Sequence, residues 1–181
     1  MMLKAAIRSP NPVIFLENEL MYSQSFKIDN PDFFDASKVT PIGKAKIMRS
    51  GDHVTMVSFS RMVGVCEKAA DELAKEGISV EVINMRSIKP LDRETILNSV
   101  MKTGRLVAVE DGYPTSGVTA EILSAVMESE AFDYLDAPAQ RVTAWDIPMP
   151  YAKSLENIST PRVVDVVQAA KTTMKGVKLT V

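Results

Sequence analysis

The sequence of 181 residues contains a single cysteine, Cys66, and a single histidine, His53. One cysteine excludes a disulfide within the chain and is typical of a reducing compartment. One histidine excludes metal sites built from several histidines, and a Ser-His-Asp or Cys-His arrangement would have to use His53. His53 stands at the entry of a predicted strand, away from the usual ligand edge, and Cys66 lies beside the apolar stripe of a predicted helix. Structural roles are predicted for both.

Long apolar runs and an excess of one charge are also missing. No apolar run approaches the roughly 20 residues that a membrane span requires. The net charge is −2 and no basic run occurs, so neither a membrane nor nucleic acid is a predicted partner. The first residues show neither a secretory signal pattern nor the arginine and serine content of a transit peptide. With 46% hydrophobic and 24% charged residues, the chain has the composition of a globular domain.

From residue 45 onward, strand-like and helix-like segments alternate. Alternation of this kind predicts parallel strands joined by right-handed crossovers, in a three-layer α/β fold with helices on both faces of a mainly parallel sheet. The last helix is predicted to open at Thr160-Pro161, with threonine as the N-cap. The other segments are strands at 53–59, 78–83, 105–109 and 140–145, and helices at 61–76, 92–101 (capped by Asp92) and 117–128.

The first 40 residues follow a different pattern. The run VIFLE at 13–17 predicts a short buried strand, and the irregular stretch 18–44 is rich in Asn, Asp, Ser and Pro. A connection of this length without structure is uncommon inside a compact domain. We therefore expect residues 1–40 to be the last strand and linker of an upstream domain, and residues 41–181 to form a second domain.

The loop VEDGYPTSGVTAEI at 109–122 resembles a phosphate-binding loop in its glycine spacing. Gly112 and Gly117 fit the spacing, but Val118 stands where a lysine must reach the phosphates. Glu110 and Asp111 would also repel a polyanion. The residues therefore favour a turn at Gly112 and a helix that starts at Gly117, with the two acids serving as helix caps or interface groups.

The segment 134–156, YLDAPAQRVTAWDIPMPYAKSLE, is rich in proline and carries the only tryptophan, Trp145, and Tyr151. A rigid segment that presents aromatic and acidic groups suits a protein interface, because such a segment loses little conformational entropy when it docks. A well-packed surface loop explains the same residue types equally well, so both interpretations stay open.

Several of these stretches occur together, in order, in one known family. FLENELMYSQSF, IGKAKIMRSGDHVTMVSFSR, EGISVEVINMRSIKPLD, VEDGYPTSGVTAEI and FDYLDAPAQRVTAWDIPMPYAKSLE resemble the beta subunit of the first, decarboxylating component of the pyruvate dehydrogenase complex. The resemblance runs from about residue 3 to residue 171. It implies a transketolase C-terminal-like domain preceded by the end of a pyrimidine-binding domain.

The resemblance also implies a function. The family's intact enzyme is an α2β2 tetramer that uses thiamine diphosphate and magnesium to decarboxylate pyruvate and to acetylate the lipoyl groups of the acetyltransferase reductively, which leads to acetyl-CoA. No position of this chain matches the family's catalytic, cofactor-binding or metal-binding residues, which belong to the upstream domain. We therefore expect this piece alone to bind neither cofactor and to be inactive. The location implied is the mitochondrial matrix in a eukaryote and the cytoplasm otherwise.

The partners implied are the alpha subunit, a second beta subunit, and the basic subunit-binding domain of dihydrolipoyl acetyltransferase. The aspartate of the family's LDAP motif contacts that domain, and here it is Asp136. The extreme carboxyl terminus also takes part in some relatives, whereas this chain ends in a longer tail, MKGVKLTV. Two alternatives remain: a beta-subunit piece of another 2-oxo acid dehydrogenase, and a free-standing α/β ligand-binding module. A hydrolase is not favoured, because a nucleophile elbow of the G-x-S-x-G type is missing.

Overall fold

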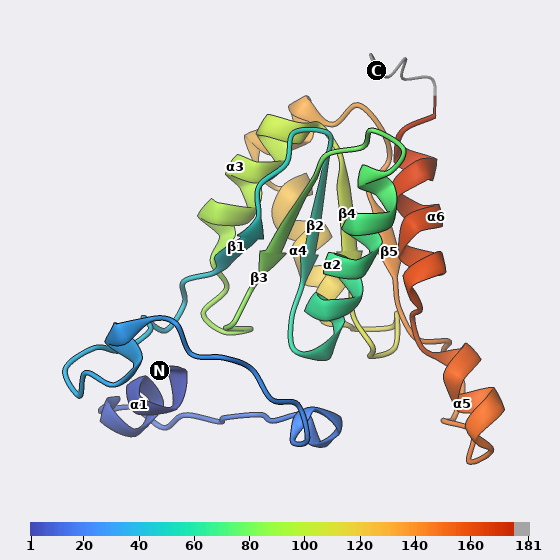
Figure 1. Cartoon of the computed structure of the whole chain (residues 1–181). Coiled ribbons are helices and arrows are strands. Elements are labelled where there is room, and N and C mark those ends of the chain that lie inside the picture. The colour runs from blue at the N-terminus through green and yellow to red at the C-terminus, as the bar shows by residue number, and fades with distance from the viewer. Residues whose placement is uncertain (176–181) are drawn as a thin grey trace.

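A five-stranded sheet forms the centre of the chain (Figure 1). The computed structural model describes residues 1–175. The strand order is β1-β3-β2-β4-β5, with β1 antiparallel to β3 and the other neighbouring strands parallel. The predicted mainly parallel sheet is confirmed. The strands are β1 (Lys46–Arg49), β2 (Val54–Ser58), β3 (Val80–Asn84), β4 (Leu106–Val109) and β5 (Gln140–Val142).

Helices cover both faces of the sheet, as the alternating pattern predicts. α2 and α6 lie on one face, and α3 and α4 lie on the other (Figure 1). Neighbouring residues of β2 show the reason, since Met56 packs into the α2–α6 layer and Val57 into the α3–α4 layer, both fully buried. The four helices are α2 (Arg61–Ala74), α3 (Arg93–Thr103), α4 (Val118–Met127) and α6 (Val163–Thr173).

The edge strand β1 is an element that the sequence pattern does not reveal. It is short and half exposed, and its register against β3 shifts between Ile47 and Arg49. Asp92 ties this edge to α3. Its carboxylate accepts the Ala45 N–H at 2.8 Å and caps α3 through the Thr95 N–H at 3.3 Å. The predicted capping role of Asp92 is therefore confirmed.

Residues 13–17, expected to be the last strand of an upstream domain, form no strand in this chain. A strand requires a neighbouring strand to accept and donate its backbone hydrogen bonds, and none in the described chain pairs with these residues. Ile14 and Leu16 are 88% and 78% exposed. The first 40 residues hold only short elements: α1 (Met2–Arg8), η1 (Glu19–Met21) and η2 (Pro31–Phe33).

The predicted start of the last helix at Thr160-Pro161 is wrong, because α6 begins at Val163. An unpredicted helix, α5 (Lys153–Ser159), has Thr160 as its C-cap, and the Thr160 hydroxyl donates to the Glu156 carbonyl. α6 begins two residues after Pro161, with Arg162 as its N-cap. The Arg162 N–H donates to the Asp165 carboxylate at 2.9 Å. Thr160 therefore closes one helix rather than opening the next.

Candidate partner-docking site

The loop after β4 is closed by a carboxylate of the chain itself. Glu110 is 3% exposed and accepts the Val118 N–H at 3.0 Å and the Thr119 N–H at 3.1 Å, as well as the Thr119 hydroxyl. Arg141 lies 3.7 Å from the same carboxylate. The free amides at the start of α4, which would hold a phosphate in a phosphate-binding loop, are thus already satisfied by an anionic side chain. Of the two roles predicted for Glu110, helix cap or interface group, the structure shows the helix cap.

Gly117 permits this arrangement. A Cβ atom at Gly117 would lie 2.2 Å from a Glu110 carboxylate oxygen and 2.5 Å from the Tyr113 carbonyl oxygen. Close packing therefore requires glycine at position 117, the second glycine of the spacing that resembles a phosphate-binding loop. The residues of this loop do not fit the diphosphate of a cofactor, because the buried Glu110 carboxylate occupies the place that the diphosphate would need.

His53 and Cys66 have the structural roles that the sequence predicts. The Nδ1 atom of His53 accepts the Ser79 N–H at 3.0 Å, which ties the entry of β2 to the entry of β3. Cys66 is fully buried in α2, and burial raises the pKa of its thiol to about 12. Among residues 1–175 no group of three or more His, Cys, Asp or Glu side chains has the geometry to hold a metal ion. No helix in the same range is long and apolar enough to cross a membrane.

Asp136, the predicted partner-binding residue, lies near the amino-terminal end of β4, whereas that loop follows the carboxyl-terminal end. It follows η3 (Glu130–Tyr134), and its N–H donates to the Gly104 carbonyl just before β4 at 2.8 Å. Its side chain is 59% exposed, and one carboxylate oxygen forms an ion pair of 2.8 Å with Arg105. Asp136 is thus held firmly while it remains accessible to a partner.

Arg105 holds the Asp136 side chain in place, and the sequence alone does not indicate this role. Its side chain is 12% exposed. It donates to the carbonyl of Thr173 at the end of α6 at 3.1 Å and to the carbonyl of His53 at 3.4 Å. Gly104 has φ of +68°, and a Cβ there would lie 2.6 Å from an Asp136 carboxylate oxygen. Arg105 therefore fixes the Asp136 carboxylate, and the absence of a side chain at Gly104 leaves room for it.

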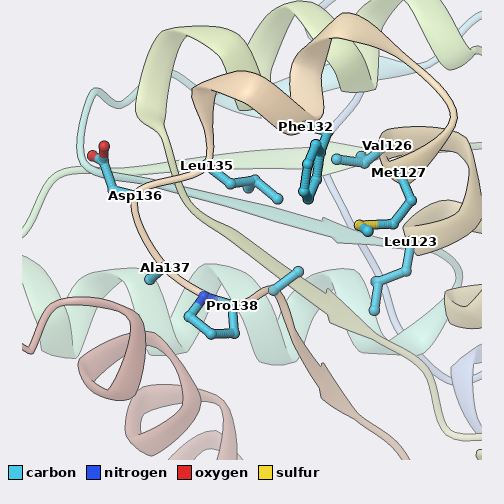
Figure 2. A pocket seen from close by; sticks show the side chains of 9 residues that line it. Leu123, Val126, Met127, Phe132, Leu135, Asp136, Ala137 and Pro138 are labelled. Carbon is cyan, nitrogen blue, oxygen red and sulfur yellow. The ribbon is translucent and has the colours of Figure 1, made fainter.

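An apolar hollow of about 530 Å³ lies beside Asp136, between α4 and η3. Figure 2 shows Leu135, Phe132 and Met127 on one side of the chain at 135–138, while the Asp136 carboxylate points away from them. Met127 and Phe132 are 58% and 48% exposed. The hollow is lined by Leu123, Val126, Met127, Phe132, Leu135, Asp136, Ala137, Pro138 and Ala139.

The chain around the hollow is acidic. Residues 118–140 contain five carboxylates and no lysine, arginine or histidine. Glu128 pairs with Arg93 at 3.1 Å, and Asp136 pairs with Arg105. The other three, Glu121, Glu130 and Asp133, form no ion pair within the described residues. This surface therefore favours a basic partner.

The proline-rich segment that follows presents a second apolar surface. Tyr151 is fully exposed and Trp145 is 56% exposed, so the aromatic side chains face outward as an interface requires. α5 adds Leu155, which is 50% exposed. Figure 1 shows α5 at the end of a connection that leaves the sheet and returns to α6.

The mainly parallel five-stranded sheet between two helical layers is an α/β fold of the transketolase type. The chain belongs to the family described as "Transketolase, C-terminal domain", which matches residues 43–166. Among solved structures, the chain is similar to "Split gene transketolase, inactive beta4 tetramer", with a TM-score of 0.66 and 26% identity over 80% of this chain and 45% of that chain.

Within that class the chain is similar to beta subunits of pyruvate dehydrogenase. It is 58% identical over 170 residues to "Pyruvate dehydrogenase E1 component subunit beta-1, mitochondrial" of Arabidopsis thaliana, and 56% identical over 173 residues to the human "Pyruvate dehydrogenase E1 component subunit beta, mitochondrial". The resemblance inferred from the motifs is confirmed. These matches cover 94% and 96% of the chain but only 46% and 48% of the relatives, so the chain spans about half of their length.

Proposed function

We propose that this chain is the assembly and docking part of a pyruvate dehydrogenase beta subunit. In the intact α2β2 enzyme, the beta subunit acts with the alpha subunit to decarboxylate pyruvate and acetylate lipoyl groups reductively, on the path to acetyl-CoA. The identity to mitochondrial pyruvate dehydrogenase relatives supports this reading and a place in the mitochondrial matrix. It favours pyruvate dehydrogenase over another 2-oxo acid dehydrogenase or a free-standing module.

Thiamine diphosphate and magnesium supply the decarboxylation chemistry when bound to the intact enzyme. We assign no residue of this chain to them, since Glu110 fills the one loop with phosphate-like spacing. Residues 1–40 belong, in this proposal, to the pyrimidine-binding domain and its linker, and residues 41–181 to the docking domain. The 181-residue chain alone is then inactive toward pyruvate. Calorimetry with both cofactors tests this assignment, and clear micromolar binding would contradict it.

Docking centres on Asp136. The observation that supports this role is an exposed carboxylate held by a nearly buried arginine, within a stretch, residues 118–140, that contains no basic residue. One oxygen of the carboxylate is engaged by Arg105, and the other is free to receive a lysine or arginine of the acetyltransferase's basic subunit-binding domain. Because Arg105 already holds the Asp136 side chain, that side chain loses little conformational entropy on binding.

The proposed docking is tested by calorimetry between the 181-residue chain and the isolated subunit-binding domain. Asp136→Asn is expected to weaken binding by about 1–3 kcal/mol, or roughly 5- to 150-fold. Glu72→Gln is the matched control, because it removes the same charge from α2 on the opposite face of the sheet. Equal affinities of Asp136→Asn and the control would remove Asp136 from the interface.

The part of the segment 134–156 that follows β5 is proposed to contact the other subunits of the tetramer. Its apolar side chains, including Trp145 and Leu155 on the α5 side, are what a permanent subunit interface buries. Tyr151→Ser is expected to lower the yield of α2β2 tetramer in size-exclusion chromatography when full-length subunits carrying this change are co-expressed. An unchanged tetramer yield would exclude Tyr151 from the contact.

The tail is the remaining part of the predicted interface. Its last residues, 176–181, lie outside the described residues.

A further inference from the structure

The hollow between α4 and η3 leaves apolar side chains at the surface next to the docking carboxylate. Met127 and Phe132 each keep about half of their surface exposed, although both lie on elements whose inner residues are fully buried. Val126, the neighbour of Met127, is 1% exposed, and Ala131, the neighbour of Phe132, is fully buried. Packing of this domain therefore does not account for the outward apolar side chains.

Charge limits what can cover the hollow. Residues 118–140 carry only acidic charges, and a second copy of the same face would bring like charges together. Isologous pairing of two such faces is disfavoured for that reason. A partner with basic residues around an apolar side chain has the complementary chemistry, because interfaces commonly seat an apolar anchor inside a polar rim.

We propose that the hollow receives an apolar side chain of the same basic domain that pairs with Asp136. This inference rests on the proposed docking function and extends it, because docking then has two contributions with different physical signatures. The ion pair at Asp136 weakens as salt rises, through screening. Burial of an apolar side chain against Met127, Phe132 and Leu135 does not weaken in this way.

The two contributions are separated by calorimetry at low and at high ionic strength. The 181-residue chain is titrated with the isolated subunit-binding domain. Met127→Ser and Phe132→Ser are each expected to weaken binding about tenfold at both ionic strengths, with the salt dependence of the wild type. Asp136→Asn is expected to weaken binding and also to reduce its salt dependence.

Val164→Ser is the matched control, because Val164 is 59% exposed on α6, on the opposite face of the sheet. It is expected to bind as the wild type does. Circular dichroism and urea unfolding establish that each variant is folded. Met127 is the more exposed of the two test positions, so Met127→Ser alone tests the apolar contact if Phe132→Ser unfolds.

These measurements separate a failure of the apolar contact from a failure of the docking function on which it rests. Wild-type affinity of Met127→Ser, together with a loss in Asp136→Asn, would overturn the apolar contact and leave the docking function in place. No binding of the wild-type chain would overturn the docking function itself. A loss in Met127→Ser accompanied by a change in salt dependence would also contradict the inference, since no charge is removed.

Discussion

Replacement of Glu110 by alanine is the most demanding test of how the domain is built. The carboxylate is 3% exposed and accepts two backbone N–H groups at the start of α4, together with the Thr119 hydroxyl. Losing a cap costs about 0.5–2 kcal/mol, and each buried donor left without a partner costs about 1–3 kcal/mol. Because these costs overlap, we expect the free energy of unfolding to fall by about 3 kcal/mol.

Urea unfolding followed by circular dichroism measures this loss, and the midpoint of thermal unfolding should fall by roughly 6–12 °C for a chain of this length. Glu121→Ala is the control, because it removes an exposed carboxylate from the first turn of the same helix and should cost less than about 0.5 kcal/mol. A loss for Glu110→Ala no larger than that of the control would refute the capping role, and with it the reason why the loop rejects phosphate.

Three further predictions concern stability and reactivity. Asp92→Ala should destabilise the chain by about 1–3 kcal/mol at neutral pH in urea unfolding. Burial opposes the charged form of Asp92, but its hydrogen bonds hold its pKa below 3.8. Its contribution should therefore persist above pH 3.8 and disappear as the pH falls through the lower, folded-state pKa, whereas a pH-independent difference from Asp92→Ala would contradict this. Cys66 should react with a thiol reagent only at the rate of unfolding, and fast labelling of the folded chain would contradict its burial. Gly104→Ala should destabilise the chain by at least about 1 kcal/mol, since alanine at φ of +68° is strained and would collide with Asp136; an unchanged unfolding midpoint would contradict this.

Much of the sheet could be predicted from the sequence because apolar runs and helix caps mark its parts. β4 is marked by a continuous apolar run, and α3 and α4 are marked by Asp92 and Gly117 at their starts. β1 could not be predicted, because an edge strand of four half-exposed residues lacks the apolar run of a central parallel strand. The segment 13–17 shows the opposite case: its residues have strand propensity, but the described chain offers them no neighbouring strand.

The candidate site was only partly predictable. The LDAP motif points to Asp136, and the acidic neighbours suggest a capping role for Glu110. The part played by Arg105 depends on contacts with Asp136, Thr173 and His53, which lie far from it in the sequence. The hollow likewise depends on how η3 packs beside α4, which no local pattern specifies.

Hydrogen–deuterium exchange of the 181-residue chain, with and without the acetyltransferase's subunit-binding domain, tests the central claim most directly. Docking at Asp136 and the neighbouring hollow predicts that exchange slows in residues 127–139, while α2 and the exposed face of α6 exchange as they do in the free chain. Protection confined to α2 and α6, or to the loop at 110–117, with none at 127–139, would contradict the account.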